Sequence, residues 1–195
     1  MNDELKIVEN KPEQKSKVLV TLFEWVELFV ISVTVVMILL TCIMRYSPVS
    51  GSSMNETLQD KDVLILSNLF YTPENGDIVV FESQITGYDE PYVKRVIATE
   101  GQTVDIRLVG NELEVTVDGV RPEYENYPTY KGVPRTTYSS DIQYPYTVPE
   151  GHVFCMGDNR WNSRDSRDIG PVDTREIVGH VVLRLFPFNV FGKVN

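Results

Sequence analysis

Several polar side chains in this sequence stand at spacings that could support nucleophilic chemistry. Residues 50–58 read SGSSMNETL and place three serines around one glycine. A serine becomes a nucleophile only beside a base and a site that stabilises an oxyanion. The common hydrolase pattern G-x-S-x-G is absent, because the residues around Ser53 read GSSMN. The serines alone therefore leave a catalytic site and a solvated loop both open.

A candidate base lies in residues 92–97, which read YVKRVI. In a strand, Lys94 and Arg95 point to opposite faces, so one of these cations must point toward the protein interior. Strand geometry does not decide which one. A lysine in an apolar setting can lose its proton near neutral pH and act as a base. The alternative is an edge strand from which both cations reach water.

A third stretch, residues 157–172, reads GDNRWNSRDSRDIGPV and is dense in hydrogen-bonding side chains. Three Arg, three Asp and two Ser fall within 11 residues of it. Carboxylate–guanidinium pairs in such a loop could form a rigid polar support beneath a site. By contrast, residues 76–81, GDIVVF, indicate by themselves only a turn and a strand.

Other chemistries fit the composition poorly. The only histidines, His152 and His180, are not near a recognisable nucleophile motif, and with Cys155 they are too few for a usual zinc site. No phosphate-binding loop is present. The net charge of −10, from 18 Lys+Arg against 28 Asp+Glu, argues against nucleic-acid binding, which needs clustered cations. Cys42 and Cys155 are expected to be free thiols. Cys42 lies in an apolar segment that is predicted below to cross a membrane, and pairing it with Cys155 would require the domain after that segment to fold into the lipid.

The elements that position these residues are mainly strands. After Arg45, short β-branched runs alternate with turn residues. The clearest hairpin joins Thr103–Val109 to Glu112–Val117 through Gly110-Asn111, where a positive φ is cheap. Residues 121–146 indicate a long irregular excursion. The other predicted strands are 62–66, 77–81, 92–97 and 176–185.

An apolar segment precedes this domain. Val18–Met44 contains 27 residues interrupted only by Glu24 and Glu27, enough to cross a bilayer. A cleaved signal peptide would have a shorter apolar run followed by small residues, and a core helix apolar on all sides would be unusual in so small a domain. Four lysines precede the segment, which favours a cytoplasmic N-terminus. The sequence thus predicts a cytoplasmic tail (1–17), a transmembrane helix (18–44) and an extracytoplasmic domain (45–195).

Together these stretches resemble the sequence boxes of the bacterial type I signal peptidases, membrane-anchored serine proteases with a Ser/Lys dyad. The single N-terminal span is most similar to the Gram-positive branch. The resemblance implies a mainly β, barrel-like catalytic domain with an inserted β lobe at about 102–150. The matching boxes are S-M-x-x-T-L at 53–58, G-D-I-V at 76–79, Y-V-K-R-V-I at 92–97, G-D-N-R-x-x-S-x-D-S-R at 157–167 and the ending R-L-F-P-F at 184–188.

The resemblance implies a role for individual residues. Ser53 matches the nucleophile, and its backbone N–H would donate to the oxyanion. Lys94 matches the general base. The resemblance therefore implies that Lys94, and not Arg95, points inward. Ser163 matches the serine that orients the lysine amine, while Asp165 and Arg167 match a supporting ion pair.

Three further positions bear on the substrate. Met54 and Gly51 are expected to contact it, and Gly51 stands where some members carry a hydroxyl as the second oxyanion donor. Glu56 stands where the family usually has Pro, and Ala98–Gln102 where it usually has G-L-P-G-D. Neither departure removes a catalytic group.

The implied activity is removal of signal peptides from exported preproteins after an Ala-x-Ala junction. The expected partners are preproteins and membrane lipid, with no metal, organic cofactor or nucleic acid. A self-cleaving repressor-type Ser/Lys protease would carry a DNA-binding domain, which the acidic charge and the anchor oppose. A catalytically silent, membrane-tethered β-domain that binds a protein partner stays open. Covalent labelling of the serine would separate it from an enzyme.

Overall fold

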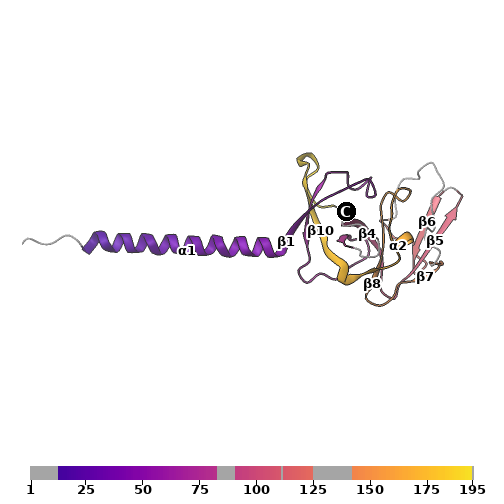
Figure 1. Ribbon diagram of the computed structural model, residues 1–195, viewed down its shortest axis with the longest axis horizontal. Helices are drawn as coiled ribbons and strands as arrows, with labels where there is room; N and C mark the ends of the chain where they lie inside the picture. Colours follow the sequence, from indigo (N-terminus) through magenta and orange to yellow (C-terminus); the bar gives the residue numbers. More distant parts are fainter. Residues whose placement is uncertain (1–12, 83–90, 111, 125–141, 195) are drawn as a thin grey trace, which may run out of the picture. The chain divides into compact units, whose positions relative to one another are not determined.

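The computed structural model describes residues 13–82, 91–110, 112–124 and 142–194, in two compact units with a boundary after Cys42 (Figure 1). The first unit contains α1 (Glu13–Ile43), in which Lys17–Ile38 is long and apolar enough to cross a membrane. None of this window is buried, so α1 does not behave as a core helix. The helix begins within the predicted polar tail, because Glu, Gln and Lys are good helix formers that extend it beyond the apolar residues.

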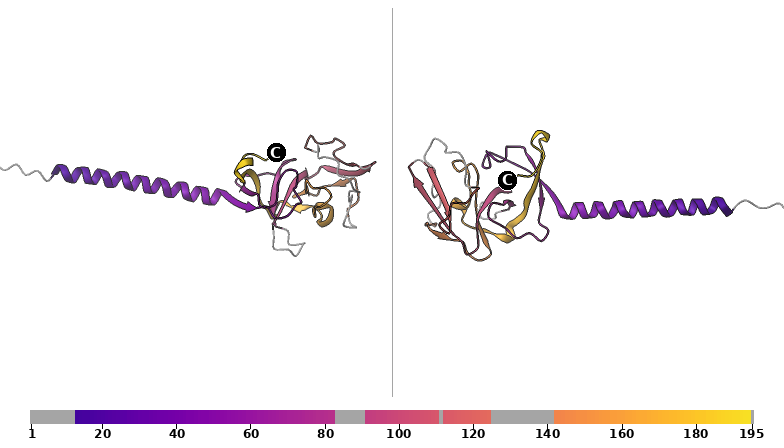
Figure 2. Two further views of the ribbon diagram at one scale, coloured as in Figure 1. Left: turned by 90° about the horizontal axis from the view of Figure 1, so that it is seen from above. Right: turned by 180° about the vertical axis from the view of Figure 1, so that it is seen from behind.

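The second unit is mainly β and confirms the predicted fold class. Its larger sheet is an antiparallel, curled half-barrel with the strand order β1-β2-β10-β3-β4-β8-β9 (Figure 2). The strands are β1 (Met44–Pro48), β2 (Val63–Ser67), β3 (Ile78–Phe81), β4 (Tyr92–Thr99), β8 (His152–Met156), β9 (Val172–Asp173) and β10 (Ile177–Phe186). In the described part of this unit, the short helices are α2 (Ser166–Ile169), η2 (Thr174–Glu176) and η3 (Phe188–Val190).

A smaller sheet contains the predicted hairpin. β5 (Thr103–Val109) pairs with β6 (Glu112–Val117) in the expected register, and β7 (Tyr146–Thr147) adds to the other edge of β5. Within this unit, the small sheet and β1 lie at opposite ends (Figures 1 and 2). Most of the predicted irregular excursion, residues 125–141, lies outside the described residues.

Strand alternation explains how the core forms. β2 alternates half-buried and buried residues, whereas β3 and the interior of β4 are buried on both faces. One apolar cluster joins Val93 of β4 to Met54 and Leu58 of the loop that carries Ser53. Burial of these side chains therefore holds the serine loop against the strand of the candidate base.

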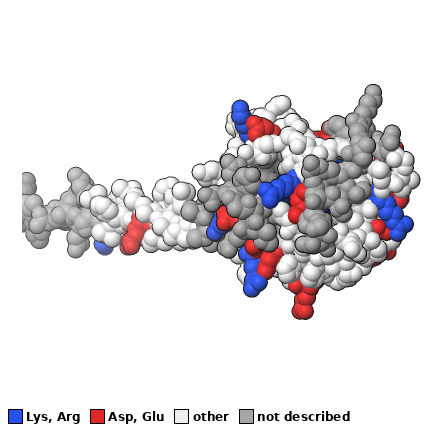
Figure 3. Space-filling view, turned by 45° about the vertical axis from the view of Figure 1, so that its right-hand side comes forward, with Lys and Arg blue, Asp and Glu red and all other residues white. Residues whose placement is uncertain are grey.

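Charged side chains on the surface form no single basic patch on the face drawn in Figure 3. There, Lys and Arg lie interspersed with Asp and Glu among uncharged residues.

Candidate active site

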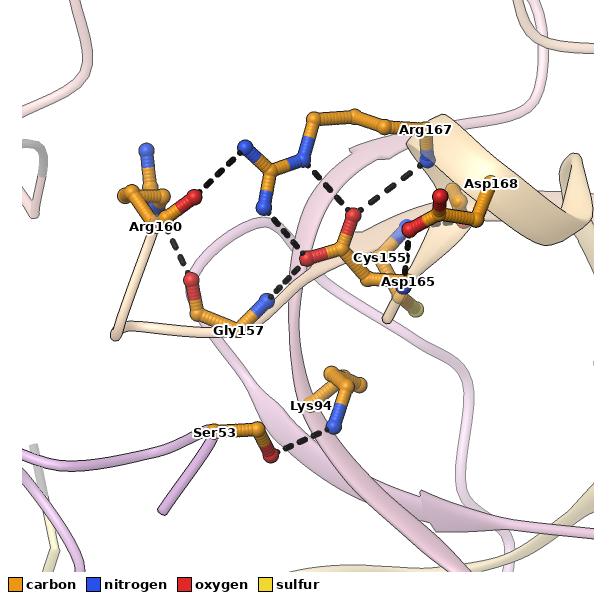
Figure 4. Close-up of polar contacts among 9 residues, drawn as sticks. Ser53, Lys94, Cys155, Gly157, Arg160, Asp165, Arg167 and Asp168 are labelled. Atoms are coloured by element: carbon orange, nitrogen blue, oxygen red, sulfur yellow. Dashed lines mark hydrogen bonds and ion pairs between the residues drawn. The ribbon is translucent and has the colours of Figure 1, made fainter. Parts of the chain in front are cut away.

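The structure brings Ser53 and Lys94 together from segments 41 residues apart in the sequence. Lys94 Nζ donates a hydrogen bond of 2.7 Å to Ser53 Oγ (Figure 4). It donates another of 2.9 Å to the Val93 carbonyl. Tyr92 lies beside the amine, with its ring centroid 5.4 Å from Nζ. A serine hydroxyl within hydrogen-bond reach of a potential base is the geometry that nucleophile activation requires.

Burial gives Lys94 the electrostatics of a base. Its side chain is only 3% exposed, and loss of hydration lowers its pKa from 10.5 to about 8. The Asp165 carboxylate opposes this shift, while the Arg167 guanidinium adds to it. A useful fraction of the amine is therefore neutral at mildly alkaline pH, and only the neutral form can accept the proton of Ser53.

The loop around Ser53 is fixed by its buried neighbours. Met54 and Leu58 are almost fully buried, and the Leu58 N–H donates to the Met54 carbonyl to close a turn. Gly51 has a φ of +85°, which glycine adopts without steric cost, and its N–H donates to Asp60. Met54 was expected to contact substrate, but it is a core residue that anchors the loop. Gly51 is exposed, and its contact with substrate stays a prediction.

The polar loop after β8 holds the serine segment from the other side. Asn159 donates from its backbone N–H to the Ser53 carbonyl, at 2.9 Å, and from its amide to the Ser52 carbonyl, at 3.0 Å. Asn162 donates to Ser52 Oγ at 2.9 Å. Neither asparagine was predicted as a site residue, although both stand in the dense polar stretch. The Ser53 N–H, in contrast, makes no hydrogen bond within the described part of the chain.

Asp165 and Arg167 form a fully buried ion pair that shapes this loop. Arg167 donates to both carboxylate oxygens at 2.8 Å, and the Gly157 N–H donates to one of them at 2.9 Å (Figure 4). Burial by itself would raise the pKa of Asp165, but the Arg167 guanidinium together with Ser163 and the Gly157 N–H outweighs burial and holds that pKa below its usual range. Asp165 also caps α2 through the backbone of Arg167. The predicted supporting ion pair is thus present.

Ser163 lies close to the dyad without bonding to it. Its Oγ is buried beside the Asp165 carboxylate, where it helps to lower that pKa, yet it makes no hydrogen bond of good geometry in the described region. The hydrogen bond to Lys94 that the resemblance implies is not formed here. Gly157 explains how closely these groups pack, because a Cβ on it would lie 2.2 Å from Ser163 Oγ and 2.5 Å from the Ser53 carbonyl.

A second buried ion pair was missed. Arg95, the neighbour of Lys94, donates to both oxygens of Asp158 at 3.0 and 2.8 Å and to the Gly76 carbonyl at 2.7 Å. Thr57 donates to the same carboxylate at 2.5 Å. Both cations of β4 are therefore buried, and the edge-strand alternative is wrong. Arg95 shares a strand face with Val93 and Ile97, and this apolar setting was the signal that its charge needs an anionic partner.

The dyad opens into a cleft of about 280 Å³. Its lining residues are Ser50, Ser53, Pro91, Tyr92, Val93, Lys94 and Arg164. A larger pocket of about 430 Å³ lies at the other end of β4, where Tyr71, Glu100 and His152 line it, and it shares no lining residue with the cleft. The other histidine, His180, stacks on Tyr71. The partner of Ser53 is therefore a lysine, and neither histidine lines its cleft.

Comparison with known families identifies this arrangement. The family model of signal peptidase, peptidase S26, matches residues 22–186. The chain belongs to this family. The signal peptidase match covers α1 from Leu22 onward together with the dyad, so the resemblance predicted from the sequence boxes is confirmed.

Curated signal peptidases match over most of their length. Probable signal peptidase I-1 of Synechocystis sp. is 37% identical, over 77% of this chain and 74% of the relative. Signal peptidase I of Bacillus licheniformis is 33% identical, over 90% and 94%. Signal peptidase I S of Bacillus subtilis is 32% identical, over 96% and 98%. A solved signal peptidase I from Enterococcus faecalis is 27% identical, covering 56% of this chain and 97% of that one with a TM-score of 0.37.

One departure from the signal peptidase pattern has a structural correlate. Glu56 has a φ of +88°, whereas proline fixes φ near −65°. The usual proline could not adopt this backbone without a change in the loop after Ser53. The stretch Ala98–Gln102 also departs from the family pattern. Its first residue, Ala98, is buried in the apolar cluster that joins β4 to the hairpin.

Proposed function

We propose that this peptidase removes signal peptides from exported preproteins, with Ser53 as the nucleophile and Lys94 as the general base. The observation that carries the proposal is the 2.7 Å hydrogen bond between Lys94 Nζ and Ser53 Oγ. A lysine whose pKa is lowered to about 8 by burial is suited to this role. The relatives named signal peptidase I support the choice of substrate.

The first half of the reaction forms an acyl-enzyme. Neutral Lys94 accepts the hydroxyl proton as Ser53 Oγ attacks the scissile carbonyl, and the Ser53 N–H donates to the developing oxyanion. The Lys94 ammonium then gives its proton to the departing amine. That amine becomes the N-terminus of the mature protein, and the signal peptide stays bound to Ser53 as an ester.

The second half hydrolyses the ester. Lys94, neutral again, accepts a proton from water as the water oxygen attacks the acyl carbon, and then returns a proton to Ser53 Oγ as the C–O bond breaks. The signal peptide leaves with a carboxylate end. The chain supplies every group in this cycle except water.

The positioning residues act through the dyad. We assign Asp165 and Arg167 to hold the polar loop, and Ser163 to orient the Lys94 amine when substrate fills the cleft. Small substrate residues, typically Ala-x-Ala, are expected before the cut because the sequence boxes resemble those of type I enzymes.

The membrane arrangement belongs to the same proposal. Residues 1–17 would form a cytoplasmic tail, 18–44 the transmembrane helix and 45–195 the extracytoplasmic peptidase domain, with residues 102–150 as its inserted lobe. The excess of lysine before the span supports this orientation. The domain would then meet preproteins as they emerge from the membrane.

The test is cleavage of a preprotein with an Ala-x-Ala junction by the full chain in detergent. Wild type, Ser53→Ala and Lys94→Ala are compared between pH 6 and 10. Cleavage at the junction by wild type alone supports the proposal, while full activity of Lys94→Ala would rule out the proposed base. Failure of wild type to cut several preproteins, together with no labelling of Ser53 by a serine acylating agent, would favour a silent binding domain.

A further inference from the structure

The cleft beside the dyad has an unusual charge for this molecule. The chain carries a net charge of −10, yet the described residues that line the cleft include two cations, Lys94 and Arg164, and no carboxylate. Lys94 must be neutral when it acts as a base, so it contributes little positive charge during catalysis. A guanidinium, in contrast, is charged throughout the ordinary pH range. Among the described side chains that line the cleft, Arg164 therefore carries the permanent charge.

The backbone around Arg164 is held rigidly. The residues on either side, Ser163 and Asp165, are buried, and Asp165 is fixed by Arg167. Asn162 is tied to the serine loop through Ser52. The Arg164 side chain itself is exposed and lines the cleft with Ser53. The fixed backbone places the base of this side chain beside the nucleophile, so binding of a ligand by the guanidinium costs side-chain freedom but no ordering of the loop.

We infer that Arg164 is a specificity-determining residue, which binds an acidic side chain carried by the substrate next to the scissile bond. The inference deepens the proposed function and rests on it. The planar guanidinium donates paired hydrogen bonds to a carboxylate, and it repels an ammonium group. If small residues fill the two Ala positions, the acidic side chain stands either at the x of Ala-x-Ala or just after the cut.

The size of the effect follows from exposure. An ion pair that water still reaches is worth little, so a Glu substrate is expected to have a kcat/KM about two- to fivefold above its Gln counterpart. A Lys substrate should fall below Gln by a similar factor. Salt screens such charges, so the preference should shrink at 0.5 M NaCl.

The experiment uses the full chain in detergent and preproteins that differ only in Glu, Gln or Lys at each of these two positions. Wild type is expected to prefer Glu over Lys at one position. Arg164→Gln should remove that preference, and Arg164→Glu should reverse it. Arg107→Gln is the matched control, since Arg107 is an exposed arginine of β5 outside the cleft, and its Glu-to-Lys ratio should equal that of wild type.

The possible outcomes distinguish failure of the inference about Arg164 from failure of the proposed function. If wild type cleaves all the preproteins with equal kcat/KM, the inference is overturned and the peptidase assignment stands. If Arg164→Glu lowers every rate equally without reversing the order, Arg164 is a structural residue and the inference also fails. If wild type cleaves none of them, the proposed function itself fails.

Discussion

Replacing Lys94 with methionine is expected to abolish cleavage and yet to make the folded protein more stable at pH 7. The reason is that burial lowers the pKa of Lys94 to about 8, while in the unfolded chain it returns to 10.5. Below pH 8 both states hold the proton, and the folded state bears the whole cost of a buried charge. That difference in pKa corresponds to ~3 kcal/mol.

The cost should disappear as pH rises, because between pH 8 and 10.5 the unfolded chain binds more protons than the folded one. Stability of wild type relative to Lys94→Met should therefore rise by ~1.3 kcal/mol from pH 7 to 9, and by ~2.5 kcal/mol from pH 7 to 10. Urea unfolding of both full-length proteins in the same detergent at each pH measures this difference directly. Methionine is one atom shorter than lysine and fills most of the same space without a charge.

The matched control is Lys193→Met, since Lys193 is exposed near the C-terminus. Its effect on stability should be small and independent of pH. Should Lys94→Met prove less stable than wild type at pH 7, or should the gap between them stay constant from pH 7 to 10, the reasoning from burial to a lowered pKa would be refuted.

Three further predictions concern the same site. First, kcat/KM should rise about tenfold from pH 7 to 9 and then level off, because the neutral fraction of a base with a pKa of about 8 grows from ~0.1 to ~0.9, and a flat profile would contradict this. Second, Gly157→Ala should lower kcat at least about tenfold, since its Cβ would lie 2.5 Å from the Ser53 carbonyl; an active variant would show that the loop can move. Third, Arg95→Met should lower the free energy of unfolding by ~3–5 kcal/mol by leaving Asp158 buried without its partner, and adding Asp158→Leu should restore most of it. Thermal unfolding of the single and double variants checks the last.

Alternation along the chain was enough to predict much of the fold. The hairpin of β5 and β6 and the strands β2, β3, β4 and β10 lie within one or two residues of their predicted bounds, because each buries one or both faces in a regular pattern. β1 was missed since MRYSP is a mostly exposed edge strand without alternation. β8, HVFCM, was missed because its short apolar run has no period of two.

The site was harder to predict, since its parts meet only after folding. Strand geometry left open whether Lys94 or Arg95 points inward, and the resemblance to signal peptidases selected Lys94. The structure buries both, on opposite faces of β4. The lysine bonds to a hydroxyl, and the arginine pairs with a carboxylate. No local pattern could reveal that the backbone N–H of Asn159, which is distant in the sequence, would donate a hydrogen bond to the Ser53 carbonyl.

Burial and the charged groups around Lys94 together decide whether it can act as a base. A lone carboxylate beside a lysine favours the ammonium and would keep the amine protonated at neutral pH. Asp165 acts in that direction, but Arg167 shares its carboxylate through two hydrogen bonds and acts in the opposite one. Arg167 offsets only part of the Asp165 effect, and Asp158 also favours the ammonium, but loss of hydration outweighs these charges and lowers the pKa. The buried ion pair thus holds the loop rigid beside the dyad, and it favours protonated Lys94 less than a lone carboxylate would.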